Sequence, residues 1–140
     1  MNFNNLIKQV NELEMPPLSH ISSVGILPND GGVIDGFPDC VLSFNESEFR
    51  LHIFRGYLKP KYEGEIKTFL FEDIKEIEMG KYNLKDRYIK IIFKNDKFIA
   101  FSYGFKIRKY PSQQENILRF ITKLESISKE EIKESSKKAD

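Results

Sequence analysis

Two stretches in which apolar and polar residues alternate constrain most strongly what this chain can fold into. Residues 40–54 and 87–103 each follow the period of two that a strand imposes, and a short polar turn interrupts each of them. With its tip at Glu46-Ser47, the first stretch predicts a hairpin. One apolar face would hold Cys40, Leu42, Phe44, Phe49, Leu51 and Ile53. The other face is mixed, so we expect His52 to point outward, on the opposite side from Cys40.

The second stretch predicts a hairpin with Asn95-Asp96 at its turn. In that register Phe93 faces Phe98 on the core side, and Ile91 faces Ala100. The opposite face carries more apolar area than a solvated strand face should, so we expect something to cover it. The candidate partner surface consists of Arg87, Lys90, Ile92, Lys94, Ile99 and Phe101.

Helical spacing marks the two ends of the chain. Apolar residues in 3–13 recur at helical intervals and stop before Pro16, which predicts an amphipathic N-terminal helix within residues 1–15. Its apolar stripe is expected to dock on the domain or on another copy. A second stripe predicts a helix over 112–127, with Ser112 and Glu115 in the spacing of a capping box. The apolar face is lost beyond Ile127, so residues 128–140 are expected to form a charged, solvated tail.

The stretch between the hairpins connects them. Thr68 to Phe71 is an apolar, strand-forming run, Glu72-Asp73 interrupts it, and alternation resumes up to Met79. This pattern predicts a strand, a bulge or single turn, and a second strand from about residue 75. Residues 28–39 and 55–64 are expected to be loops.

The run Phe71-Glu72-Asp73-Ile74-Lys75-Glu76-Ile77 resembles the apolar-x-Asp-Ile-x-x-Ile junction of bacterial pleckstrin-homology-like (PH/GRAM-type) domains. The flanking hairpins and the closing helix are in the order of that family, and the resemblance covers roughly residues 22–127. It implies an α+β fold, mainly an antiparallel curved sheet or partly open PH-like barrel, with a C-terminal capping helix and an extra N-terminal helix. It also implies a scaffold that binds proteins, peptides or lipid headgroups and rarely catalyses a reaction.

Charge is unevenly distributed along the 140 residues. Residues 81–109 carry nine Lys/Arg and two Asp, whereas residues 1–80 carry seven Lys/Arg and thirteen Asp/Glu. The basic segment can attract either phosphate or an acidic protein, and the sequence leaves both open. The early loop 28–39 holds three aspartates and no Lys or Arg, which argues against phosphoinositide binding there. The basic and aromatic loop 55–64 is short and has no known nucleic-acid motif, so nucleic acid is not expected as a partner.

The chemistry-bearing residues do not form a recognisable catalytic or metal-binding motif. His20 and His52 are far apart, Cys40 is the one cysteine, and no nucleophile or dinucleotide fingerprint is present. We therefore expect no enzyme activity, no cofactor and no metal. A lone cysteine and the lack of a secretory or membrane-spanning run favour the cytoplasm. Frequent Lys, Asn and Ile resemble the coding bias of an AT-rich bacterial or phage genome.

The sequence thus predicts a non-catalytic interaction module that binds a protein partner and self-associates as a homo-oligomer. Two alternatives stay open. One is an inhibitor or accessory protein of a phage or mobile element, and the other is a barrel that binds a small molecule or a lipid headgroup.

Overall fold

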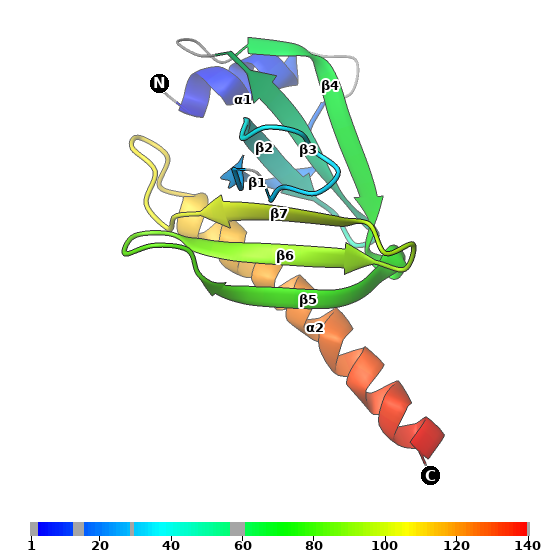
Figure 1. Ribbon diagram of the computed structural model, residues 1–140. Helices are drawn as coiled ribbons and strands as arrows, with labels where there is room; N and C mark the ends of the chain where they lie inside the picture. The colour runs from blue at the N-terminus through cyan, green and yellow to red at the C-terminus, as the bar shows by residue number, and fades with distance from the viewer. Residues whose placement is uncertain (1–2, 13–15, 29, 57–60, 140) are drawn as a thin grey trace.

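The structure is a computed structural model that describes residues 3–12, 16–28, 30–56 and 61–139 (Figure 1). The elements follow in the order α1 (Phe3–Asn11), β1 (Ser19–Ile26), β2 (Asp39–Phe44), β3 (Glu48–Arg55), β4 (Lys61–Leu70), η1 (Phe71–Asp73), β5 (Ile74–Lys81), β6 (Arg87–Phe93), β7 (Phe98–Tyr103) and α2 (Gln113–Ala139). The N-terminal helix is confirmed; its predicted end at Leu13 lies outside the described residues.

The seven strands of the described residues belong to one open antiparallel sheet in the order β4-β3-β2-β1-β7-β6-β5. Strand β1 is the link between the halves, because it pairs with β2 on one side and with β7 on the other. The sheet bends at this link, so β2–β4 and β5–β7 are two differently oriented halves (Figure 1). The predicted α+β class, with antiparallel sheet and a helix at each end, is therefore observed.

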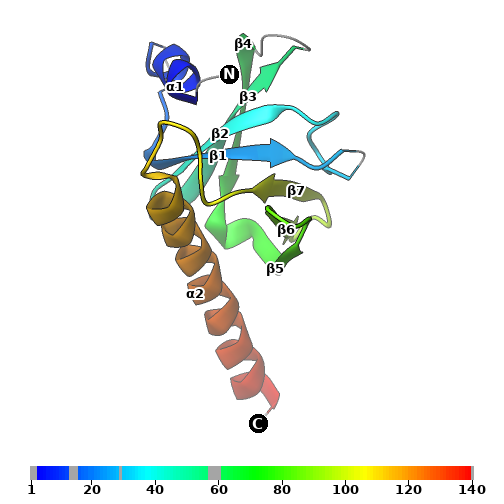
Figure 2. The same cartoon turned by 90° about the vertical axis from the view of Figure 1, so that its left-hand side faces the viewer.

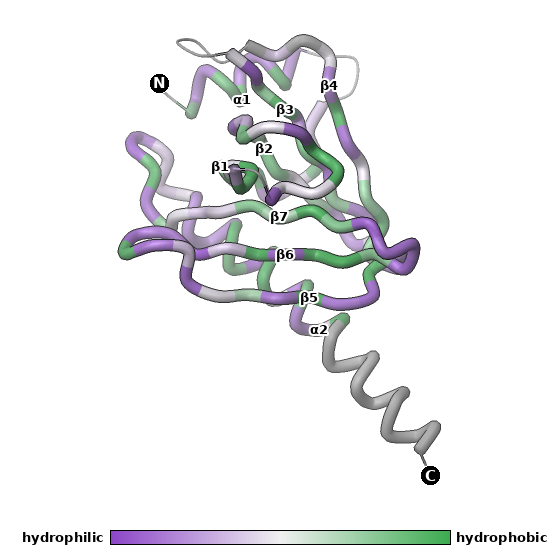
Figure 3. Tube along the Cα trace, in the orientation of Figure 1, coloured by the Kyte–Doolittle hydropathy of each residue, from purple (hydrophilic) through white to green (hydrophobic). Residues whose placement is uncertain are grey.

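Helix α2 packs on β1 and β5, along one side of the bent sheet, and runs on past β5 (Figure 2). It buries Ile117, Phe120 and Leu124 in the main core. Phe120 is the centre of an aromatic cluster, with ring centroids 5.3 Å from Phe44 and 5.4 Å from Phe49 in edge-on geometry. Hydrophilic residues gather instead at the hairpin turns (Figure 3). The helix begins where expected and continues to Ala139, beyond its predicted end at Ile127.

The N-terminus of α2 is tied to β1 by buried polar side chains. Gln113 is fully buried. Its Oε1 accepts the Ser23 backbone N–H at 2.8 Å, and its Nε2 donates to the carbonyls of Ser23 at 2.9 Å and Gly104 at 3.0 Å. Close by, Asn116 Nδ2 and the Tyr110 hydroxyl both donate to the Ile21 carbonyl. The buried amide of Gln113 thus satisfies three partly buried backbone groups.

Helix α1 covers the outer face of β2 and β3. Phe3, Leu6 and Val10 form a second, smaller core with Val41 and Phe54. The apolar stripe of α1 therefore docks on the domain, which was one of the two expectations. His52 does lie on the opposite strand face from Cys40, but the prediction that it points into solvent is wrong, because its side chain is fully buried.

The first hairpin has the predicted register. Cys40 pairs with Ile53, Leu42 with Leu51 and Phe44 with Phe49. The Asn45 side chain holds the turn, since its Oδ1 accepts the backbone N–H groups of Ser47 and Glu48.

The register of the second hairpin was predicted wrongly by one residue. Ile91 pairs with Ile99 and Ile89 with Phe101. The loop has three residues rather than two, since Phe93 N–H donates to the Lys97 carbonyl at 2.8 Å and Asp96 adopts a left-handed φ of 67°. A shift of one residue moves every side chain of β7 to the other face. Ile99 and Phe101 are consequently at 0% exposure in the core and cannot belong to an exposed partner surface.

The connecting stretch makes the corner between β4 and β5. The predicted break is a single 3-10 turn, η1, whose first residue, Phe71, is buried. Two backbone bonds fix this corner: Phe71 N–H donates to the Ser47 carbonyl, and Lys94 N–H donates to the Asp73 carbonyl. The loop expected at 55–64 is shorter than predicted, because β4 begins at Lys61; residues 57–60 lie outside the described part of the chain.

Candidate functional site

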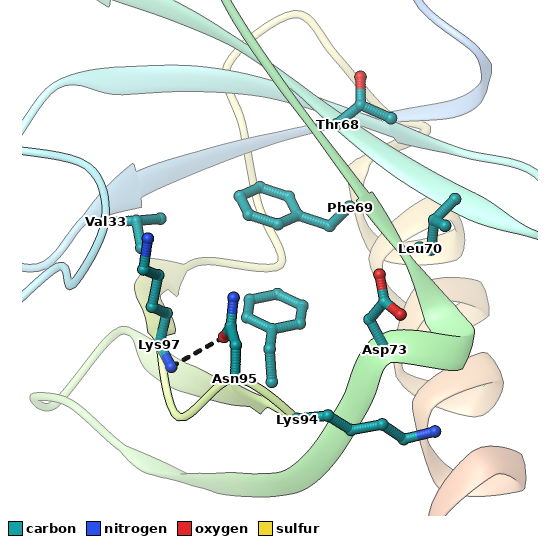
Figure 4. Close-up of a pocket in the computed structure, with 9 residues that line it drawn as sticks. Val33, Thr68, Phe69, Leu70, Asp73, Lys94, Asn95 and Lys97 are labelled. Carbon is teal, nitrogen blue, oxygen red and sulfur yellow. Dashed lines mark hydrogen bonds between the residues drawn. The ribbon is translucent and has the colours of Figure 1, made fainter.

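A pocket of about 520 Å³ lies at the corner where β4 faces the β6–β7 turn (Figure 4). We call it the corner pocket. Its lining comes from the β1–β2 loop, the end of β4, η1 and the β6–β7 turn. These residues are Val33, Thr68, Phe69, Leu70, Asp73, Phe93, Lys94, Asn95 and Lys97. The volume is within the range of sites that hold a small ligand or a side chain with its neighbours.

The floor of the pocket is aromatic. The rings of Phe69 and Phe93 stack with centroids 5.0 Å apart and planes only 9° from parallel. Phe49, fully buried in β3, stacks on Phe69 from behind at 5.0 Å. The floor therefore rests on the main core and offers an apolar surface that changes little in shape.

The rim of the pocket is basic. In the β6–β7 turn, Asp96 is paired with Lys75 at 2.8 Å. That hydrogen bond lowers the pKa of the Asp96 carboxyl and raises the pKa of Lys75. Lys94 and Lys97 form no ion pair within the described residues. The turn thus contributes two cations without an ion pair to the lining, Lys97 on the side of Val33 and Lys94 on the side of Asp73, which is the acidic residue of the lining (Figure 4).

The wall that carries Val33 is fixed by an arginine clamp. Arg55 binds Glu65 through two hydrogen bonds, of 2.7 and 3.1 Å, and donates through Nη1 to the Asp35 carbonyl at 2.9 Å. The hydrogen bond from Arg55 lowers the pKa of Glu65. Beyond this point, Val33 N–H donates to the Phe98 carbonyl, so the β1–β2 loop is joined to β7. The pocket wall is therefore built from a loop held at both ends.

The structure separates the six residues of the predicted partner surface. Lys94 lines the corner pocket. Lys90 and half-buried Ile92 lie on the outer face of β6, where Lys90 Nζ sits 4.5 Å from the ring centre of Phe98. Arg87 is exposed at the far end of β6, paired with Tyr103. Only Lys90, Ile92 and Lys94 thus remain near one another.

Sequence reasoning missed Val33, Phe69 and Lys97 as members of one site. The apolar run that holds Phe69 predicts a strand that connects the two hairpins, and nothing in it indicates a pocket. Three segments from distant parts of the chain meet at the pocket, and no local pattern in the sequence reports that they do.

The single cysteine is in no position to act as a nucleophile. Cys40 is fully buried, and burial together with the neighbouring Asp39 carboxylate raises the pKa of its thiol. Across the described residues, no three His, Cys, Asp or Glu side chains come together as a metal site would need. No helix in the described part of the chain is long and apolar enough to cross a membrane.

Among solved structures, the chain is similar to the hSac2 domain from the human phosphoinositide phosphatase Sac2. The TM-score is 0.52 at 15% sequence identity, over 93% of this chain and 82% of that one. At this identity the likeness concerns the fold alone. No protein-family description matches the chain, and no curated protein is significantly similar to it in sequence.

Proposed function

We propose that this protein is a non-catalytic, PH-like interaction module of the cytoplasm that binds a protein partner at the corner pocket. The PH-like assignment is supported by the strand order. Strands β1 to β4 form one antiparallel meander and β5 to β7 form another, and the two meanders are joined where β1 pairs with β7. A C-terminal helix against the bent sheet and the corner at Phe71–Asp73 agree with it.

The observation that carries the proposal is that one charged residue of the β6–β7 turn is paired while two others are not. Lys75 compensates Asp96, yet Lys94 and Lys97 are left unpaired beside an apolar floor. Leu70 and Val33 add exposed apolar area to the rim, at 39% and 36% exposure. Cations around an apolar, preformed surface suit a partner that brings both acidic and apolar groups.

The alternatives fare differently. The apolar outer face that suggested self-association is smaller than expected, because Ile99 and Phe101 are in the core. A small anionic molecule remains a second candidate, since the pocket has a suitable volume and two lysines at its rim. Native mass spectrometry of the purified protein tests that candidate, because a retained anion would favour it.

Quantitative affinity capture from a lysate of the source organism tests the proposal. The bait is the protein itself, next to a Lys94→Glu/Lys97→Glu variant and a Lys85→Glu/Arg108→Glu control. The control changes the same net charge at exposed residues away from the pocket. We expect at least one protein to be enriched by the wild type and the control and lost with the pocket variant. Equal capture by all three baits would refute the corner pocket as the binding site.

A further inference from the structure

The corner pocket lies beside a free sheet edge. Strand β4 is the last strand on one side of the sheet, and no strand of the described chain pairs with its outer edge. An unpaired edge presents backbone N–H and C=O groups that can bind another strand. The other sheet edge, β5, is equally unpaired, so the two edges can be compared directly.

The two edges differ in how they are protected. Strand β5 carries Lys75, Glu76, Glu78 and Lys81, and charged side chains of this kind discourage a second strand from pairing. Strand β4 is charged up to Lys67, but its last three residues, Thr68-Phe69-Leu70, carry no charge and no proline. The unprotected part of the sheet edge is thus the part that borders the corner pocket.

The register shows which backbone groups are free. Phe71 N–H donates to the Ser47 carbonyl, and the β3–β4 ladder continues from there with Phe69 opposite Phe49. Hydrogen-bonded and non-bonded pairs alternate along an antiparallel ladder. Phe69 therefore bonds to β3, whereas the N–H and C=O groups of Thr68 and Leu70 point to the free edge.

We propose, on the basis of the function proposed above, that the corner site takes an extended acidic segment of the partner protein as an added strand on β4. The segment pairs with the free backbone groups of Thr68 and Leu70. Its residue opposite Phe69 is apolar and packs on the Phe69–Phe93 stack. Its acidic side chains face Lys94 and Lys97, the cations that the fold leaves uncompensated. Backbone pairing supplies affinity, and the pocket and the lysines supply specificity.

A defined peptide tests this binding mode in the full-length protein. The probe is a blocked peptide with a central phenylalanine flanked by alternating valine and glutamate; the comparison peptide has lysine in place of glutamate. Titration followed by backbone NMR should show the glutamate peptide binding at least about tenfold more tightly, because two like-charge encounters replace two attractions. In the complex, amide exchange should slow at Thr68 and Leu70 and stay unchanged at Phe69.

A proline substitution isolates the backbone contribution. Leu70 has φ −89°, near the angle that proline requires, and its N–H is not used by β3. Leu70→Pro should therefore keep the fold and weaken the peptide at least about fivefold, whereas Leu70→Val should leave binding within about twofold. We expect the NMR signals of the core to be unchanged in Leu70→Pro, which is the check that this variant is folded.

The outcomes separate the two proposals. Absence of binding at millimolar peptide, equal binding of both peptides, or unaltered exchange at Thr68 and Leu70 would each overturn strand addition. If a partner is captured by the wild type and lost with Lys94→Glu/Lys97→Glu, but the peptide experiments exclude an added strand, the partner binds at the pocket by another mode. If both fail, the function proposed for the corner is wrong as well.

Discussion

Gln113 is fully buried and joins helix α2 to strand β1 through its side-chain amide, so its loss should destabilise the fold. The perturbation is Gln113→Leu, which keeps the bulk of the side chain and removes its amide. Three partly buried backbone groups then lose their partners: the N–H and C=O of Ser23 and the C=O of Gly104. A partly buried polar group without a partner costs about 1 to 1.5 kcal/mol, the lower end of the usual range, so the three together cost about 3 to 4.5 kcal/mol.

Urea unfolding followed by circular dichroism measures this loss. Domains of this kind have a free energy of unfolding of about 5 to 15 kcal/mol, so the variant should lose a large fraction of its stability. The neighbouring Gln114 is exposed and gives a matched control. Gln114→Leu should change the free energy of unfolding by less than about 0.5 kcal/mol. If Gln113→Leu also stays below about 1 kcal/mol, the reasoning about backbone satisfaction at the start of α2 is refuted.

Three further predictions concern the turn, the cysteine and the arginine clamp. Asp96→Val should destabilise the protein by about 1 to 2 kcal/mol and Asp96→Gly by less, because only the glycine tolerates the φ of 67°; urea unfolding distinguishes them. Cys40 should react with a thiol reagent at the rate of unfolding rather than at that of a free thiol, since burial raises its pKa; rapid labelling of the native protein would contradict this. The pKa of Glu65 is lowered by Arg55, so the stability from this pair is present above the usual glutamate pKa and is lost as pH falls through the lowered value. The pair is partly exposed and contributes about 1 kcal/mol or less, and Glu65→Gln should remove that part of the pH dependence of unfolding.

The contrast between the two hairpins shows what sequence can determine. In 40–54 one face is apolar throughout, whereas the other face mixes Val41 and Phe54 with polar residues, so burial favours the register in which the apolar face is complete. In 87–103 both faces carry apolar residues, with Ile92 and Phe98 outside and Ile91 and Ile99 inside. Burial then gives no preference between neighbouring registers. The left-handed backbone conformation of Asp96 allows a three-residue loop, and the loop length sets the register.

The site was harder to predict than the fold for a related reason. The helices, the corner at Phe71–Asp73 and most strands follow from local periodicity. The corner pocket instead depends on the bend of the sheet, which brings Val33, Phe69 and Lys97 together from distant segments. Lys94 was found because it belongs to a charged hairpin, but its role beside an aromatic floor depends on contacts that span most of the chain.

Site-specific photocrosslinking tests the central claim most directly. A benzophenone side chain at position 70 reports on the rim of the corner pocket. One at position 84 serves as the control, because Leu84 is fully exposed in the β5–β6 turn, at the end of β6 that lies away from the pocket. We predict that irradiation in a lysate of the source organism yields a discrete crosslinked protein from position 70 and none from position 84. The product should disappear in the Lys94→Glu/Lys97→Glu background. The same products from both positions, or a product at 70 that persists after charge reversal, would contradict the account.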